Sequence, residues 1–147
     1  MTEQFFEKEL ACRQIEAIPG FLEFDIPVHG DNRGWFKENF QKEKMVPLAF
    51  PESFFAEGKL QNNVSFSRKN VLRGLHAEPR DKYISVADEG KVLGTWVDLR
   101  EGDSFGQLTK PSLTPQKASL FLVAWQTDSK SYLTRFLIAT WSTTTGH

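Results

Sequence analysis

Cysteine is nearly absent: the 147 residues include only Cys12, so no disulfide can form within the chain. A chain of this kind suits a reducing compartment, and we predict a cytoplasmic protein. No apolar run reaches the roughly 18 residues that a membrane helix needs, and residues 1–10 are acidic and polar, unlike a signal peptide. The formal net charge of -1 argues against a general nucleic-acid or membrane surface. We therefore expect neither as a partner.

Histidine is also scarce, and the three residues, His29, His76 and His147, are scattered along the chain. They do not have the spacing with Cys, Asp or Glu that a metal site requires. No glycine-rich loop opens a helix, so the phosphate-cradle and dinucleotide fingerprints are missing. The G-x-S-x-G elbow of serine hydrolases is missing as well. The sequence therefore predicts neither a metal nor a cofactor.

The length of 147 residues fits one domain. Before Gly106 the sequence is dominated by short segments in which apolar and polar residues alternate with a period of two. Apolar residues alternate from Gly20 to Val28 and again from Lys59 to Ser67. Further strands are expected at 35–40, 71–76, 82–87, 91–99 and 120–125, with a helical turn or two at 41–48. Asp88-Glu89-Gly90 is a hairpin signal between two of these strands. Many short strands with polar turns favour an all-β fold, an antiparallel barrel or a jelly roll.

One face of the predicted strand 59–67 is polar and carries the side chains of Gln61, Asn63, Ser65 and Ser67. A solvent-facing strand surface explains this pattern simply. A small barrel offers a second explanation, because its interior can hold a ligand. Amides that line such a cavity recognise a sugar or a base through directed hydrogen bonds. The pattern alone leaves both explanations open.

The segment Arg73-Gly74-Leu75-His76 and the nearby Lys82 could support acid–base chemistry. A single His in a strand is often only structural, but His is also the commonest general base. A Lys beside it would stabilise an oxyanion. In a regular strand Arg73 and His76 point to opposite faces, whereas a bulge at Gly74 would re-aim one of them. The sequence leaves both arrangements open.

These segments together resemble the dTDP-4-dehydrorhamnose 3,5-epimerase family. Asp31-Asn32-Arg33-Gly34-Trp35-Phe36-Lys37-Glu38 is similar to the family motif D-x-R-G-x-F-x-E, and Gln61-Asn62-Asn63-Val64-Ser65 is similar to Q-x-N-x-S. Val71-Leu72-Arg73-Gly74-Leu75-His76 is similar to V-L-R-G-L-H. Lys82, Gly90, Val97-Asp98-Leu99-Arg100 and Ser104-Phe105-Gly106 follow in the family order. The resemblance spans Asp31 to Gly106, about half of the chain. Ala77-Glu78 departs from the aromatic-Gln pair that often follows the family His.

The resemblance implies a double-stranded β-helix (cupin jelly roll), a homodimer and a dTDP-4-keto-6-deoxyglucose substrate that is inverted at carbons 3 and 5 without a cofactor. It makes His76 the general base and Lys82 the support of the enolate oxygen. By the same resemblance, the substrate-binding residues are Arg33 and Arg73 at the phosphates, with Glu38, Gln61, Asn62 and Asn63 around the nucleotide and sugar. Two alternatives remain: a cupin that binds a nucleotide sugar without turnover, and a 3-epimerase or keto-isomerase on the same scaffold.

The last third of the chain departs from this family. After Gly106 the family supplies an I-P-x-G-x-A-H-G-F-like segment, a Tyr acid and a late Asp, and none of them follows here. The segment Gln116 to Lys130 can be back-translated into DNA with freely chosen codons. A shifted reading frame of that DNA can encode S-K-S-I-F-V-P-R-G-V-A-N-G-F-Q, which is similar to the missing segment. We therefore expect one cupin domain over 1–147, with a family-like part at 1–106 and an out-of-frame tail at 107–147. Such a tail should pack poorly and leave the jelly roll incomplete, unstable or inactive.

Overall fold

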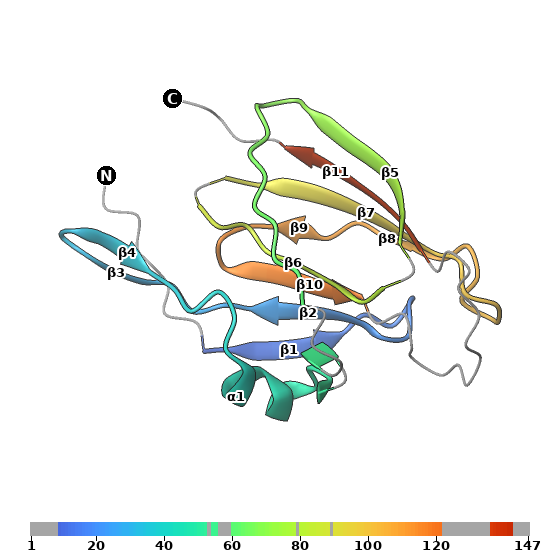
Figure 1. The fold of residues 1–147 in the computed structure, drawn as a ribbon, viewed down its shortest axis with the longest axis horizontal. Helices are drawn as coiled ribbons and strands as arrows, with labels where there is room; N and C mark the ends of the chain where they lie inside the picture. Colours follow the sequence, from blue (N-terminus) through green and yellow to red (C-terminus); the bar gives the residue numbers. More distant parts are fainter. Residues whose placement is uncertain are drawn as a thin grey trace.

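The structure, a computed structural model, describes residues 9–52, 54–55, 60–78, 80–88, 90–121 and 136–142. The regular secondary structure of this part is almost entirely strand, with one short helix, α1, and short 3-10 turns (Figure 1). The strands are β1 Ala11–Gln14, β2 Phe21–Asp25, β3 His29–Asp31, β4 Gly34–Phe36, β5 Leu72–Glu78, β6 Lys82–Ile84, β7 Val92–Asp98, β8 Leu108–Thr109, β9 Ser112–Leu113, β10 Lys117–Phe121 and β11 Phe136–Ser142. The helix α1 is Lys42–Met45, and the 3-10 turn η1 is Val46–Leu48. The expected all-β class is confirmed.

Two antiparallel sheets form the body, and a separate hairpin projects from it. One sheet has the order β1-β2-β10-β6, and the other has the order β5-β11-β7-β8, with β9 also paired to β7. The third ladder is the β3–β4 hairpin, which extends away from both sheets (Figure 1). β5 is therefore an edge strand of its sheet within the described part of the chain.

The four-stranded sheet carries apolar side chains on both faces. On β2, the alternation seen in the sequence buries Leu22 and Phe24, and Ile26 continues it just beyond the strand end. This face packs under α1 and against an aromatic group that includes Phe50 and Tyr83. Burial of a large apolar side chain contributes about 1.5–3 kcal/mol, so this face accounts for much of the stability of the sheet.

The opposite face of the same sheet contacts the second sheet through stacked rings. Phe21 of β2 lies edge-on to Trp96 of β7, with ring centroids 5.3 Å apart. Phe121 of β10 stacks on Trp96 at 5.9 Å with an interplanar angle of 4°. All three side chains are fully buried. They join the two layers at the point where β2, β7 and β10 meet.

The structure confirms a strand within 20–28, where β2 ends at Asp25, and the helical segment at 41–48, but it corrects several other expectations. β6 and β7 do not form the hairpin that Asp88-Glu89-Gly90 indicated, because β6 pairs with β10 and β7 pairs with β8, β9 and β11. The strand expected over 35–40 ends at Phe36. A local turn signal fixes a reversal of direction, whereas the pairing partner is decided by which apolar face is buried.

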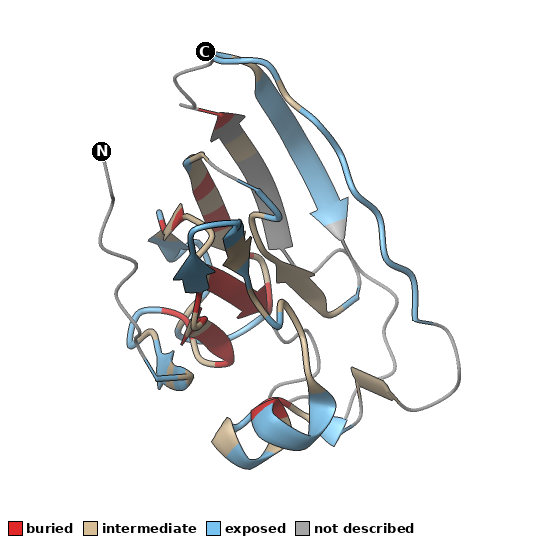
Figure 2. Cartoon of the chain, turned by 90° about the vertical axis from the view of Figure 1, so that its left-hand side faces the viewer, coloured by how far each residue is buried: buried red, intermediate tan, exposed pale blue. Residues whose placement is uncertain are grey.

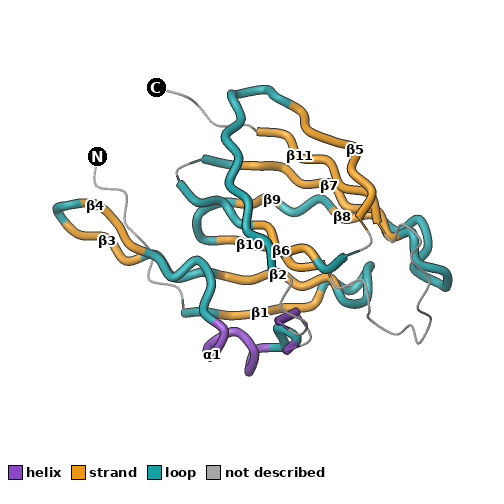
Figure 3. Tube along the Cα trace, in the orientation of Figure 1, coloured by secondary structure: helices purple, strands orange, loops and turns teal. Residues whose placement is uncertain are grey.

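The strand expected over Lys59–Ser67 is wrong for the described residues 60–67. They form an extended run without a ladder, drawn as a long loop that leads up to β5 in Figure 3. Alternation describes two side-chain faces, but a strand also needs a neighbour to pair with. Gln61 and Val64 are both exposed here, so neither face of the run is covered.

The tail beyond Gly106 packs better than expected as far as Phe121. β8 and β9 pair with β7, and β10 pairs with both β2 and β6. Ala118, Leu120 and Phe121 are fully buried. The short apolar run of β10 suits a strand that is covered on both faces. The expectation of poor packing is therefore wrong for 107–121. Residues 122–135 and 143–147 lie outside the described part. Among described residues, no helix has the length and apolarity to cross a membrane.

Candidate functional site

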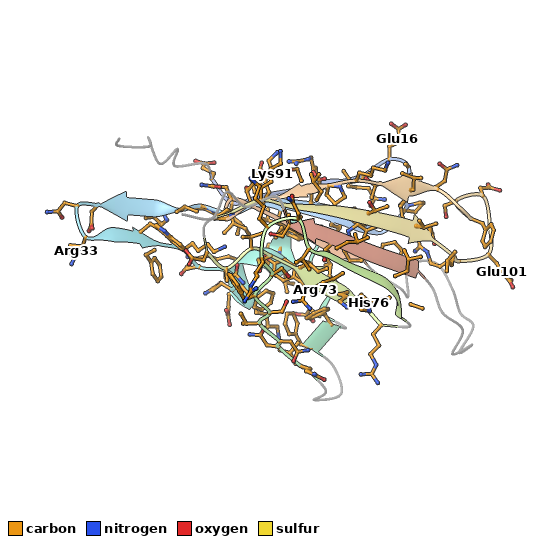
Figure 4. The ribbon with its side chains drawn as sticks, turned by 90° about the horizontal axis from the view of Figure 1, so that it is seen from above. Glu16, Arg33, Arg73, His76, Lys91 and Glu101 are labelled. Atoms are coloured by element: carbon orange, nitrogen blue, oxygen red, sulfur yellow. The ribbon has the colours of Figure 1, made fainter. Side chains whose placement is uncertain are left out.

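A bulge in β5 brings two of the predicted site residues into phase. In the register with β11, Arg73 pairs with Thr140 and His76 pairs with Ile138. Two residues of β5, Gly74 and Leu75, therefore stand against one residue of β11. Because the extra residue shifts the alternation by one, Arg73 and His76 no longer face opposite ways. The bulge that the sequence left open is confirmed, and Figure 4 labels both side chains on β5.

The chain reverses direction just before β5. The amide of Val71 donates to the carbonyl of Arg68 at 3.2 Å, and Asn70 at the third position of this turn has φ of 64°. Asn is one of the few side chains that tolerate this conformation. The turn lays the extended run 60–67 back beside β5, and the two together form the exposed face seen in Figure 2. We call residues 60–77 the β5 face.

Arg73 is held by this neighbouring run. Its Nε donates to the hydroxyl of Ser67 at 2.6 Å, and its Nη2 donates to the carbonyl of Phe66 at 2.9 Å. His76, three residues further along β5, is exposed. The guanidinium therefore has a fixed direction beside an accessible imidazole. This arrangement provides an anion-binding group next to a proton acceptor.

Lys82 begins β6 in the other sheet, where it lies opposite Phe121 of β10. β5 ends at Glu78, only four residues earlier, so the two strand ends lie at most about 14 Å apart. Lys82 is half-buried. It starts the strand that follows β5 along the chain, close to the C-terminal end of β5.

The amide residues lie on the same β5 face. Gln61 Nε2 donates to Asn63 Oδ1 at 3.1 Å, so these two side chains share one side of the extended run, as the alternation predicted. Asn62 lies between them, and all three residues are exposed. The run places several amide donors and acceptors on the surface that also carries Arg73 and His76.

The fold separates Arg33 from the residues of the β5 face. It sits in the turn of the β3–β4 hairpin with its side chain 85% exposed. Its Nε donates to Asp31 Oδ2 at 3.1 Å, and bonds from Arg33 hold the pKa of the Asp31 carboxyl below its usual range. Figures 1 and 4 place this hairpin at one end of the molecule, away from β5. Within one chain, Arg33 and His76 do not share a site.

Glu38 lies near the base of the same hairpin. Its carboxylate forms an ion pair with Lys44 of α1, and the pair borders a cavity of about 140 Å³ together with His29, Gln41 and Met45. Pockets that hold drug-sized ligands measure roughly 300–1,000 Å³. The cavity is therefore too small for a whole nucleotide sugar. Glu38, like Arg33, stands apart from the β5 face.

Sequence reasoning missed two features of the site. Ser67 was assigned only to a polar face, although its hydroxyl holds Arg73. Tyr83 belongs to no motif in the sequence, and its half-buried hydroxyl donates to the carbonyl of Asn39 at 2.9 Å. Burial raises the pKa of the Tyr83 hydroxyl above its ordinary value. Among the described residues, no three of His, Cys, Asp and Glu gather as metal ligands would.

Comparisons with known proteins place this chain among nucleotide-sugar enzymes. The sequence model of the dTDP-4-dehydrorhamnose 3,5-epimerase family matches residues 16–133, and so extends beyond Gly106. An RmlC homologue of Streptococcus pyogenes serotype M6 is 67% identical over 141 residues, covering 90% of this chain and 72% of that protein. The dTDP-4-dehydrorhamnose 3,5-epimerase of Salmonella typhimurium is 35% identical, covering 68% of this chain but only 55% of the enzyme.

The structural comparison agrees with the sequence comparison. RmlC from Streptococcus suis, solved in complex with dTDP-D-xylose, matches with a TM-score of 0.74 and 63% identity, covering 98% of this chain and 74% of that one. The enzyme of Sulfolobus tokodaii matches with a TM-score of 0.68 at 26% identity. This likeness confirms the cupin jelly roll. The chain therefore belongs to the dTDP-4-dehydrorhamnose 3,5-epimerase family.

Proposed function

We propose that the protein is an isomerase that converts dTDP-4-dehydro-6-deoxy-D-glucose into dTDP-4-dehydro-L-rhamnose, a step in dTDP-L-rhamnose biosynthesis. The observation that carries this proposal is the bulge in β5, which sets Arg73 and His76 in phase on one exposed strand. The family assignment supplies the substrate class. The curated epimerase from Salmonella is longer, and this chain spans about half of it.

The chemistry follows from the ketone at carbon 4 of the sugar. That ketone acidifies the C–H bonds at carbons 3 and 5, so a neutral imidazole can remove either proton. The C–H bond breaks, its electron pair becomes the enolate, and the proton moves to His76. Lys82 would stabilise the enolate oxygen as a cation. Return of a proton to the opposite face of the carbon then completes each inversion.

The nucleotide would be held by its diphosphate and its base. Arg73 presents a guanidinium fork that matches phosphate oxygens. Gln61, Asn62 and Asn63 offer amide groups on the same β5 face, which suits sugar and base recognition. Arg33 and Glu38 would complete the substrate contacts, as the family resemblance implies.

We further propose a homodimer as the active assembly, working in the cytoplasm. Arg33 and His76 lie at separate places in one chain, so a second copy is the simplest source of the missing contact. Sedimentation of the purified protein should give about twice the 16.8 kDa chain mass. A purely monomeric protein that still turns over substrate would overturn the proposed homodimer.

The single thiol, Cys12, is half-buried, and burial raises its pKa to about 11, which fits a structural residue in a reducing compartment.

Solvent exchange is the direct test of the proposed function. The protein is incubated with dTDP-4-dehydro-6-deoxy-D-glucose in D₂O, and proton NMR follows the signals at carbons 3 and 5. Loss of both signals with formation of the L-rhamno sugar is the expected result, and His76→Ala should abolish both. Exchange without inversion would indicate a base that works without its acid.

The alternative is a cupin that binds the nucleotide sugar without turnover. Tyr83 favours it, because its half-buried hydroxyl donates to the carbonyl of Asn39 and so is not offered to a substrate. Binding of dTDP without any exchange at carbon 3 or 5 would support this alternative. Inversion at carbon 3 alone would instead indicate a 3-epimerase, and carbonyl migration a keto-isomerase.

We also propose that residues 107–147 are read out of the original frame after Gly106. The proposal is supported by the absence of the later family motifs after Gly106 and by the family-like peptide that the shifted codons can encode, although the sequence model of the family matches as far as residue 133. The nucleotide sequence of the gene is decisive. If no family-like frame runs beneath codons 107–147, the tail is a divergent sequence and the frameshift is refuted.

A further inference from the structure

The hydrogen bonds of Arg73 occupy only one edge of its guanidinium group. A guanidinium has five N–H donors in a planar fork. The Nε–H is given to Ser67 and one Nη2–H to the carbonyl of Phe66. Within the described part of the chain, Nη1 donates to no group and no carboxylate pairs with this side chain. The outer edge, formed by Nη1 and the second Nη2–H, is therefore available to an incoming anion.

The two acceptors decide which way this outer edge points. Ser67 and Phe66 belong to the extended run, which the turn at Asn70 lays back beside β5. An unrestrained Arg side chain loses rotamer entropy when it binds a ligand. An Arg whose inner edge is already bonded has lost most of that freedom beforehand, so binding becomes more favourable.

We propose that Ser67 is a positioning residue that orients Arg73 for the diphosphate of the dTDP-sugar. The inference rests on the proposed function, which assigns the phosphate contact to Arg73. Ser67 acts through Arg73 and does not itself touch the substrate. Its hydroxyl accepts a hydrogen bond from Nε, and this fixes the plane of the guanidinium while leaving the outer edge for two phosphate oxygens.

The chemistry of the hydroxyl explains why a neutral acceptor suits this position. A carboxylate at position 67 would pair with Arg73 and compete with the phosphate for its charge. A hydroxyl accepts the same hydrogen bond without reducing the net charge of the guanidinium. Ser67→Asp should therefore impair diphosphate binding even though it keeps an acceptor in place.

Calorimetric titration of the purified 147-residue chain tests the proposal, with dTDP and thymidine as probes. We expect Ser67→Ala to weaken dTDP binding roughly fivefold, as loss of one such hydrogen bond implies, and to leave thymidine binding unchanged. Ser67→Thr keeps the hydroxyl and should restore wild-type affinity. Ser112→Ala, a matched change in β9 and outside the β5 face, should have no effect.

Two further variants keep the proposal falsifiable if Ser67→Ala does not fold. Ser67→Asp should bind dTDP more weakly than wild type, and Arg73→Lys, which lacks the fork, should make the residue at position 67 irrelevant. Equal loss of dTDP and thymidine affinity would indicate a merely structural serine and overturn the inference. Wild-type binding of dTDP that no Ser67 variant changes would overturn the inference alone. Failure of the wild-type protein to bind dTDP would overturn the proposed function and this inference together.

Discussion

Gly74 has φ of +141°, a conformation that residues with a Cβ rarely adopt, and it lies in the bulge between Arg73 and His76. The position of His76, the proposed base, relative to Arg73, the proposed phosphate-binding residue, therefore depends on a residue that has no side chain. A family motif that reads R-G-L-H thus has a physical explanation here. The glycine permits the extra residue that brings the side chains of Arg73 and His76 into phase.

Replacing Gly74 by Ala should disturb the site more than the fold. We expect a loss of about 1–3 kcal/mol in the free energy of unfolding from the strained φ, measured by urea denaturation. Hydrogen exchange at carbons 3 and 5 should fall by at least about tenfold, because a small misplacement of a base has a large kinetic effect. Gly102→Ala is the matched control, since Gly102 has φ of +126° and nothing within 4 Å of an added Cβ. Equal exchange rates in the two variants would contradict this account of the bulge.

Among the secondary-structure elements, the C-terminal end of β7 is fastened by a buried ion pair. Arg100 Nε donates to Asp98 Oδ1 at 2.9 Å, and Arg100 also donates to the carbonyl of Pro19 in the turn before β2. The Ser104 hydroxyl donates to Asp98 at 2.8 Å. Burial alone raises the pKa of the Asp98 carboxyl, but the bonds from Arg100 and Ser104 outweigh it and hold that pKa below its usual range. The family segment Val97-Asp98-Leu99-Arg100 is thus explained by packing.

Arg100→Met should destabilise the protein by about 3–5 kcal/mol, because it leaves the Asp98 carboxylate buried without its partner. The wild-type contribution of this carboxylate is fully present above its unfolded pKa and is lost as the pH falls through the lower folded pKa. Urea denaturation between neutral and acid pH should therefore show a smaller acid-dependent loss in the variant. Arg13→Met, at an exposed pair with Glu23, should cost no more than about 1 kcal/mol. Similar losses of the free energy of unfolding in the two variants would contradict the distinction between a buried and an exposed ion pair.

Lys37 connects three parts of the chain. It follows β4, and its ammonium donates to the carbonyls of Val86 and Pro115, the latter at 3.1 Å. Burial lowers the pKa of Lys37 below its ordinary value. Between the lowered folded pKa and the ordinary value of about 10.4, the unfolded chain binds the proton more readily. The stability conferred at this position therefore rises with pH in that window.

Lys37→Met should remove the rise of the free energy of unfolding with pH that Lys37 causes. Subtracting the value for the variant from that for the wild type at each pH separates this contribution from other groups that titrate at alkaline pH. The loss of the ammonium also leaves two carbonyls without their donor, which should cost about 1–3 kcal/mol. Lys110→Met, which removes an exposed ammonium, is the matched control for the loss of a lysine. A pH profile that is identical in wild type and Lys37→Met would contradict the role given to desolvation.

Considered as a whole molecule, the described chain has an open side. Leu60, Val64, Phe66, Leu72 and Leu75 are all more than half exposed and lie along the β5 face. A jelly roll ordinarily covers its interior with both sheets. The same β5 face also carries the exposed polar residues that are predicted to bind substrate. The proposed loss of the original C-terminal strands accounts for this exposure, because β5 then lacks elements that would close over it.

Restoring one base at codon 107 should therefore yield a longer and more stable protein. We expect a higher midpoint of thermal unfolding than in the 147-residue chain and inversion at carbons 3 and 5 of the sugar. The His76→Ala form of the restored protein should keep the higher midpoint and lose inversion. An unchanged midpoint would show that the tail encoded now completes the fold as well as the restored one, and would contradict the proposal.

Prediction from the sequence succeeded where the information was local. The alternation of β2 and the helical turns after Gln41 were readable from neighbouring residues. The bulge at Gly74 was left open by the sequence, and the pairing of β5 with β11 decided it. It failed where pairing partners matter. β6 and β7 went to different sheets, and the run 60–67 found no ladder within the described residues. Residues 107–121 also packed against expectation, because β10 needs only an apolar run and two neighbours.

The sequence by itself determined the all-β class, the family motifs and the kinds of chemistry available, because these depend on residue type and spacing. The tertiary structure decided which of those residues meet. It set Arg73 and His76 in phase through the bulge in β5, placed Arg33 in a distant hairpin and Glu38 beside α1, and gave Ser67 to Arg73 as a partner. The physical reason is that contacts between distant segments depend on turns and on the burial of shared faces. A motif read along the chain specifies neither of them.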